Sequence, residues 1–107
     1  MKRFGQVIGL PAESYARYKE LHAAIWPDVA KMIYEANIRN YSIYHHHGLL
    51  FAYNEYVGDD YDADMAKMAA DPMTQAWWDE CKPIMKPFED RKESEFWSDM
   101  EKLFHQD

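Results

Sequence analysis

Residues 40–53 read NYSIYHHHGLLFAY, and the topology of the chain can be worked out in both directions from this stretch. Residues 40–44 and 49–53 are rich in β-branched, aromatic and aliphatic side chains, which favours two strands. His47-Gly48 lies between them, and the glycine tolerates the backbone conformation of a tight turn. The region 40–57 therefore predicts a β-hairpin.

One strand and a broken helix are predicted before the hairpin. The composition of residues 3–10 favours a short β-strand, and Pro11 ends this strand. Apolar and aromatic residues then recur at spacings of three and four, so they lie on one helical stripe. The residues of this stripe are Tyr15, Tyr18, His22, Ile25, Val29, Met32 and Ala36. Pro27 interrupts this pattern, since a proline inside a helix loses a hydrogen bond and clashes with the preceding turn. We expect two helical pieces, with Pro27 near the first position of the second and His22 close to the break.

Two further helices are predicted after the hairpin. One begins near Asp59 or Asp60 and carries the apolar residues Tyr61, Met65, Met68 and Ala69. Asp71-Pro72 reads as a helix cap followed by a first-turn proline, starting a helix that runs to about Lys82. Its expected core line is Met73, Trp77, Cys81 and Ile84. Pro83 and Pro87 close this helix, and residues 86–95 form a charged loop.

The end of the chain supplies the last element of the fold. Apolar residues near the end fit a helical stripe better than strict alternation, namely Phe96, Met100, Leu103 and Phe104. A β-α-β-β-α pattern nevertheless lacks its final strand, and the segment from Met100 to His105 is the only remaining candidate. We therefore assign a strand to Met100–His105 on topological grounds. The resulting fold is α+β, ferredoxin-like βαββαβ, with an antiparallel sheet and helices on one face. The whole chain, residues 1–107, is expected to form a single domain.

Composition limits the classes of partner. The chain has 107 residues with a formal net charge of −7, and its basic residues are scattered, so nucleic acid is a poor partner. The single cysteine, Cys81, cannot form an internal disulfide, and no segment has the length of a signal peptide or a membrane span. We expect a cytoplasmic protein without membrane association. Four Trp, eight Tyr and five Phe are many for so short a chain, which makes an oligomer plausible.

His22 is the first candidate for chemistry. It is the one histidine within an apolar and aromatic helical stripe, and an imidazole with a pKa near 6.5 can give and take protons at neutral pH. A core histidine satisfied by a carbonyl group is the alternative. Tyr18 precedes it by four residues and points the same way. Tyr41 could reach the same space from the first hairpin strand, so two hydroxyl groups would then lie beside an imidazole.

Trp77-Trp78 is the second candidate. Neighbouring helical residues diverge by about 100°, so both indoles cannot lie on one narrow stripe. Trp77 fits the core line, whereas Trp78 would either pack against a partner subunit or form a flat apolar wall for a ligand. Such walls suit the C–H faces of sugars, and a 6-deoxy sugar adds a methyl group.

Other chemistries have less support in the sequence. His45 and His47 would share one face of a strand, but they lie at a hairpin tip without an adjacent cysteine or acidic ligand, so we predict no metal site. Cys81 lies on an apolar helical line and reads as an inert buried thiol. The four glycines are scattered, which argues against a phosphate-binding loop. The acidic residues 59–64 lack calcium-loop spacing and read as a helix start.

Several of these segments resemble the L-rhamnose mutarotase family. Residues 18–28, YKELHAAIWPD, are similar to its first-helix signature, residues 40–44 and 49–52 to its second and third strands, and residues 73–78 to its tryptophan-pair helix. The resemblance implies a dimeric ferredoxin-like domain whose sheets pack together and which needs no cofactor. It also implies that His22 is the proton donor, with Tyr18, Tyr41, Trp77 and Trp78 lining the sugar site.

The function expected from the resemblance is interconversion of the α and β anomers of a 6-deoxy sugar by acid/base ring opening, with L-rhamnose as the first expectation and L-fucose as the second. Water or a tyrosine would serve as the second proton carrier. The histidine triplet and Phe96-Trp97 depart from the best-known members and leave the sugar open. The alternatives are a dimeric ferredoxin-like monooxygenase and a non-catalytic sugar-binding domain, because this fold alone does not specify function.

Overall fold

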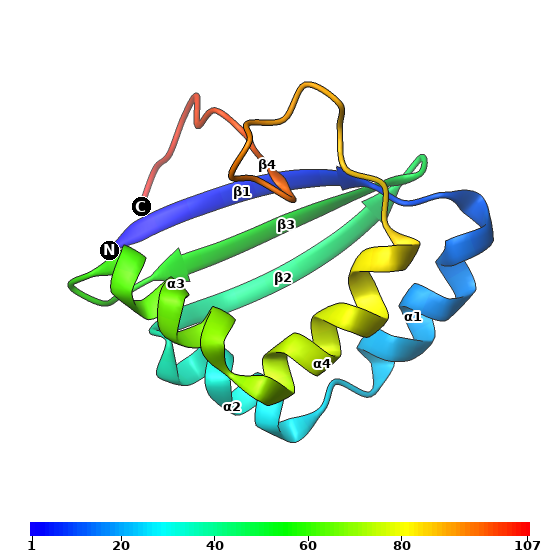
Figure 1. Ribbon diagram of the computed structural model, residues 1–107. Helices are drawn as coiled ribbons and strands as arrows, with labels where there is room; N and C mark the ends of the chain where they lie inside the picture. Colours follow the sequence, from blue (N-terminus) through cyan, green and yellow to red (C-terminus); the bar gives the residue numbers. More distant parts are fainter.

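The computed structural model describes all 107 residues as a two-layer α+β fold (Figure 1). Four strands form one antiparallel sheet in the order β2-β3-β1-β4, and the helices cover one of its faces. The elements in chain order are β1 (Lys2–Gly9), η1 (Ala12–Ser14), α1 (Tyr15–Ala23), α2 (Pro27–Glu35), β2 (Ile38–His46), β3 (Leu49–Tyr56), α3 (Tyr61–Ala70), α4 (Pro72–Cys81), η2 (Lys82–Ile84) and β4 (Ser98–Asp99). This order confirms the predicted βαββαβ fold, with each helical segment divided into two helices.

The central hairpin forms as predicted. His47 and Gly48 join β2 to β3 with φ angles of 51° and 73°, the left-handed conformation that two-residue hairpin turns require. Along β3 every second residue is buried, so one face of the strand meets the helices and the other does not. The pairing between β2 and β3 is interrupted between Arg39 and Ser42, where a bulge places Asn40 and Tyr41 opposite Asn54.

The helix boundaries follow the predicted signals. α1 ends at Ala23, Trp26 is extended, and α2 begins with Pro27 in its first turn, which confirms the predicted break. The carboxylates of Asp60 and Asp71 accept hydrogen bonds from the backbone N–H groups of Ala63 and Thr74. This confirms the predicted Asp71 cap of α4 and the predicted start of α3 near Asp60.

The core lies between the sheet and the helices. Its buried members come from β1, β3, α1, α2 and α4 and from the segments that follow β1 and α4: Ile8, Leu10, Tyr18, Leu21, Val29, Leu50, Trp77, Cys81 and Met85. Three residues of the predicted stripes are instead exposed to about the same extent, namely Tyr15, Ile25 and Met73. Ile25 falls in the non-helical break. The buried line of α4 is Thr74, Trp77 and Cys81, at spacings of three and four, so it begins one residue later than Met73.

The predicted last strand was wrong in position. β4 is Ser98–Asp99, paired with Val7 and Gln6 of β1, whereas residues 100–107 form no regular element. The cause is that Phe96 and Trp97 pack against the core, so strand pairing follows them directly. The tail then lies on the side of the sheet away from the helices and returns to the N-terminus, where Arg3 and Asp107 form an ion pair (Figure 1). The predicted charged loop at 86–95 is confirmed as a segment without helix or extended strand.

None of the helices combines the length and the apolar character that a bilayer span requires.

Candidate functional site

A cavity of about 510 Å³ lies between the helix-facing side of the sheet and the helices α1, α2, α3 and α4. This volume falls in the range of small-molecule sites. The structure brings to its wall all five side chains that the sequence singled out: Tyr18, His22, Tyr41, Trp77 and Trp78. They come from α1, the bulged part of β2 and α4, so the site requires the folded arrangement of three elements.

The hydrogen bonding of His22 defines its tautomer. Its Nδ1 lies 3.1 Å from the backbone oxygen of Tyr18. A carbonyl oxygen can only accept, so Nδ1 carries the proton of this bond, and Nε2 of the neutral ring keeps its lone pair. Burial lowers the pKa of His22, and the hydrogen bond to Tyr18 partly offsets this effect. The ring is therefore neutral at pH 7, with a basic nitrogen at Nε2.

Aromatic rings hold the His22 imidazole in place. The Tyr18 ring stacks on it with centroids 4.0 Å apart, and the Trp77 ring meets it edge-on at 5.2 Å. The Trp26 ring in turn meets the Trp77 ring edge-on, with the centroids 5.2 Å apart. Trp26 of the Ile-Trp-Pro break thus acts on the imidazole through Trp77, which links the sequence signature to the geometry of the site.

The two tyrosines keep their protons. Burial raises the pKa of Tyr41 to about 12, because its hydroxyl group lies within the protein although 41% of the residue is exposed. Burial also raises the pKa of Tyr18 well above its ordinary value, and the proximity of Tyr41 adds to the shift. Both hydroxyl groups are therefore hydrogen-bond donors at neutral pH.

The paired tryptophans have different surroundings. Trp77 is buried in the core, whereas Trp78 is partly buried and lines the cavity. The Lys82 ammonium lies 4.3 Å from the centroid of the Trp78 ring and 5.2 Å from that of Phe96. Of the two roles considered for Trp78, this position favours an apolar wall of the cavity.

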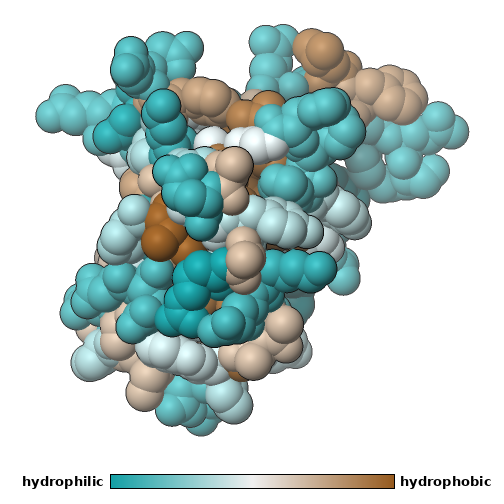
Figure 2. All heavy atoms as spheres, turned by 90° about the vertical axis from the view of Figure 1, so that its right-hand side faces the viewer, coloured by the Kyte–Doolittle hydropathy of each residue, from teal (hydrophilic) through white to brown (hydrophobic).

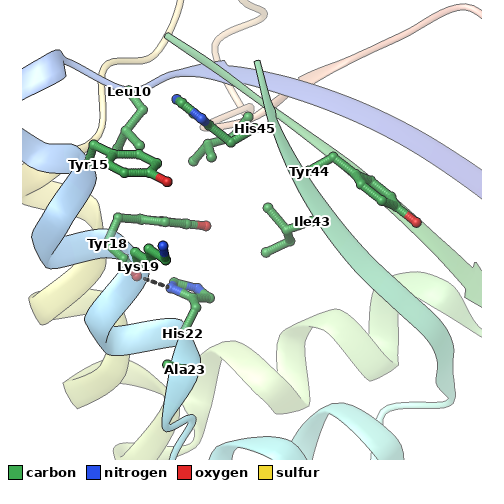
Figure 3. Close-up of a pocket in the computed structure, with 10 residues that line it drawn as sticks. Leu10, Tyr15, Tyr18, Lys19, His22, Ala23, Ile43, Tyr44 and His45 are labelled. Atoms are coloured by element: carbon green, nitrogen blue, oxygen red, sulfur yellow. Dashed lines mark hydrogen bonds between the residues drawn. The ribbon is translucent and has the colours of Figure 1, made fainter. Parts of the chain in front are cut away.

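A smaller space of about 340 Å³ adjoins the cavity between α1 and the edge strand β2. It shares Tyr18, His22 and Ile43 with the larger cavity. Figure 3 shows the side chains of Tyr15 and Tyr18 extending from α1 toward Ile43 and His45, while Tyr44 points to the other side of β2. Figure 2 faces this end of the molecule, where apolar atoms are visible between hydrophilic groups. The arrangement gives the His22 side of the cavity an opening at the sheet edge.

Sequence reasoning missed a polar part of the cavity wall. Gln6, Asn54 and Asp99 line it from β1, β3 and β4, together with Lys82 and residues of the 94–97 segment. The signal was present in the strand alternation. Asn54 continues the buried line of Leu50 and Ala52, and a polar residue in that register is unusual for a core position.

The remaining candidates lie apart from this chemistry. His45 and His46 end β2, whereas His47 lies in the turn. The expectation that His45 and His47 share one face of a strand was therefore wrong. No group of three or more His, Cys, Asp or Glu side chains is placed to hold a metal ion. Cys81 is buried, as predicted, and burial raises the pKa of its thiol to about 11.

Comparisons with known proteins agree with the resemblance seen in the sequence. A family model described as L-rhamnose mutarotase matches residues 3–106. The L-rhamnose mutarotase of Bacillus subtilis is 33% identical over 80% of this chain and 82% of the relative. That of Ligilactobacillus salivarius is 33% identical over 98% of this chain and 97% of the relative.

Solved structures share the fold across the whole chain. An L-rhamnose mutarotase from Formosa agariphila superposes with a TM-score of 0.77 at 22% identity, and a tetracenomycin F2 cyclase from Streptomyces glaucescens with 0.71 at 14% identity, each covering 100% of both chains. At these identities the likeness concerns the fold alone, and the second neighbour is a polyketide cyclase, so the fold does not select the chemistry. The assignment rests on the sequence match, by which this chain belongs to the L-rhamnose mutarotase family.

Proposed function

We propose that this protein interconverts the α and β anomers of a 6-deoxy hexose, with L-rhamnose as the first candidate. Membership of the family supports the anomer exchange, and the volume and aromatic lining of the cavity support a sugar as the substrate. The observation that carries the proposal is that the neutral His22 imidazole, with a basic Nε2, shares one cavity with two protonated tyrosines and two indoles. These groups match what ring opening needs: a base, an acid and apolar walls.

The mechanism follows from the protonation states. Nε2 of His22 removes the proton of the anomeric hydroxyl group, while the Tyr41 hydroxyl donates a proton to the ring oxygen and the C1–O bond breaks. The C1 aldehyde then turns about the C1–C2 bond. In ring closure the former ring oxygen attacks the other face of C1 and returns its proton to Tyr41, and protonated His22 returns a proton to the carbonyl oxygen. No net proton is gained or lost.

This proposal assigns the first step of His22 differently from the sequence-based expectation. The resemblance implied a proton donor, whereas the lowered pKa and the hydrogen bond from Nδ1 favour an imidazole that accepts a proton before it donates one. The two assignments describe the same residue at different points of one cycle. They differ in the protonation state of the resting enzyme.

Magnetisation transfer between the two anomeric protons in NMR tests the activity directly. We expect the wild-type protein to raise the exchange rate of L-rhamnose above the uncatalysed rate, and the same measurement on L-fucose and L-mannose ranks the substrates. Calorimetric titration with L-rhamnose runs in parallel. Binding without faster exchange would favour the non-catalytic sugar-binding alternative, and a Soret shift on addition of haem would favour a monooxygenase-type domain.

We further propose that the protein is a homodimer formed through the sheet face opposite the helices. Val7 and Tyr44 both pair with Phe51, so the three side chains lie on that face across three strands. Tyr44 is exposed, and beside the sheet the tail carries Leu103 and Phe104 with exposed fractions of 86% and 78%. Burial of such a surface by a second copy agrees with the assembly that the family resemblance implies.

A further inference from the structure

Polar side chains cross the helix-facing side of the sheet, within a layer that is otherwise apolar. Asn54 lies in β3 in register with the buried Leu50 and Ala52. Gln6 of β1 pairs with Ala52 on one side and with Asp99 of β4 on the other, so it lies on the same face. Asn54, Gln6 and Asp99 together form what we call the polar row, and all three line the cavity.

Asn54 is the member that folding does not explain. It is 8% exposed, and none of the hydrogen bonds within the protein involves its carboxamide. Ser98 Oγ is the one fully enclosed side-chain polar atom without a partner, so the Asn54 carboxamide is open to the cavity. Asn37 is a contrast, since its amide donates to Asp64 and joins the turn before β2 to α3. A buried amide without a protein partner is destabilising unless something else bonds to it.

The neighbouring pair leaves acceptors free. Gln6 Nε2 donates to Asp99 Oδ1 at 2.9 Å. The amide oxygen of Gln6 and the second carboxylate oxygen of Asp99 then remain available to accept hydrogen bonds. The polar row thus offers one donor and acceptor side by side on Asn54, and acceptors at the Gln6–Asp99 pair.

The polar row lies next to Tyr41, in the cavity that also contains His22. Across the β2 bulge, Asn40 and Tyr41 together oppose Asn54, so Tyr41 is the immediate neighbour of Asn54 on the cavity side. The indole of Trp78 lines the cavity from α4, across from the sheet. A sugar ring with its anomeric carbon at Tyr41 would therefore have neighbouring hydroxyl groups within the part of the cavity that Asn54 lines.

We propose that the polar row is the subsite that recognises the sugar hydroxyl groups, with the Asn54 carboxamide binding two neighbouring hydroxyls of the ring. Each hydroxyl group both donates and accepts, so a vicinal pair matches the adjacent oxygen and NH₂ of a carboxamide. The free acceptors of Gln6 and Asp99 take a further hydroxyl proton. This inference rests on the proposed function and extends it: the polar row sets which 6-deoxy hexose is bound and does not take part in proton transfer.

The test is Asn54→Leu, which keeps the size of the side chain and removes both hydrogen-bonding groups. We expect KM for L-rhamnose to rise about tenfold or more, as the loss of two hydrogen bonds implies, with a smaller change in kcat. The melting temperature should stay the same or increase, because an unpartnered buried amide is removed. Tyr53→Phe, on the same strand but facing the other side, is the matched control and should keep the wild-type KM.

Analogues of L-rhamnose that lack the 2- or the 3-hydroxyl group give the more specific readout. Wild type should bind at least one of them more weakly than L-rhamnose, and Asn54→Leu should lose that discrimination. Unchanged KM and unchanged discrimination in Asn54→Leu would overturn the inference, whatever the melting temperature. Asn54→Ser provides the same comparison if the leucine variant does not fold.

Calorimetric binding of L-rhamnose separates this inference from the proposed function. If wild type binds L-rhamnose but does not speed anomer exchange, the proposed function fails, and the affinity of Asn54→Leu still tests the polar row. If wild type exchanges the anomers and Asn54→Leu binds the sugar equally well, the inference about the polar row fails alone.

Discussion

At the scale of single residues, the protonation state of His22 determines how the site works. The fixed proton on Nδ1 leaves Nε2 as the base, and burial keeps the ring neutral at physiological pH. Acidification through this lowered pKa protonates Nε2 and removes the base. The tyrosines set no limit on the alkaline side near neutrality, because burial raises their pKa values.

The pH dependence of kcat/KM should show this directly. We expect a plateau around neutral pH and a decline of about tenfold per pH unit below a midpoint that lies under the ordinary imidazole pKa of about 6.5. The same protonation is less favourable in the folded than in the unfolded protein, so stability should also decline as the pH falls below about 6.5. If kcat/KM instead increases on acidification through this range, His22 is protonated in the resting enzyme and first donates its proton.

Tyr41→Phe should separate the two tyrosines. Loss of the hydroxyl group proposed to protonate the ring oxygen should lower kcat by about 10²-fold. Tyr18→Phe should have a smaller effect, because its backbone carbonyl and its ring, which orient His22, remain. Tyr34→Phe, at an exposed position, is the control. Full activity in Tyr41→Phe would point to water as the second proton carrier.

At the scale of elements, local sequence signals account for most of the fold. The hairpin turn, the Pro27 break, the start of α3 near Asp60 and the Asp71 cap each depend on a few neighbouring residues, and each was predicted. In contrast, the position of β4 in the sequence depends on which residues of the C-terminal segment pair with the edge of β1. Packing of Phe96 and Trp97 decides that, and the local pattern of residues 100–105 carried no such information.

The candidate site divides in the same way. Tyr18 and His22 could be placed together from helical spacing, but their meeting with Tyr41 and the tryptophans depends on the packing of α1 against β2 and α4. The polar row was missed because Gln6 and Asn54 become neighbours of one cavity only through strand pairing. The register of β3, read as buried alternate positions, would have identified Asn54.

The Asp71 cap should stabilise the start of α4, the helix that carries Trp77 and Trp78. Its carboxylate accepts from the Thr74 backbone N–H at 2.9 Å and from the Thr74 hydroxyl at 2.8 Å. Asp71→Ala should lower the free energy of unfolding by about 1 kcal/mol, measured by urea denaturation. Asp79→Ala, at an exposed position of the same helix, should have little effect. Equal stabilities of the two variants would mean that the cap does not secure the start of α4.

At the scale of the whole molecule, the helices cover one face of the sheet and leave the other without a helical layer (Figure 1). The polar row and the imidazole lie on the covered face, so the opposite face is free to serve assembly. The two termini meet on that side through the Arg3–Asp107 ion pair. The same sheet thus separates the proposed site from the proposed dimer interface.

Phe51→Glu should test the assembly without touching the cavity. A carboxylate in the middle of the apolar outer face would be buried without a partner in the dimer, which is strongly unfavourable. We expect wild type at the mass of two chains and Phe51→Glu at that of one, measured by light scattering after size-exclusion chromatography. Lys31→Glu, an exposed change on α2, controls for charge. A wild-type monomer would contradict the proposed dimer, and a Phe51→Glu variant that remains dimeric would place the interface elsewhere.

The most direct test of the account compares His22→Ala with His46→Ala by magnetisation transfer between the anomeric protons of L-rhamnose. Both changes remove an imidazole, but only His22 lies in the cavity, whereas His46 is exposed at the hairpin tip. We predict that His46→Ala retains the wild-type exchange rate and that the catalysed rate falls about 10²-fold or more in His22→Ala. Undiminished exchange in a folded His22→Ala protein would contradict this prediction.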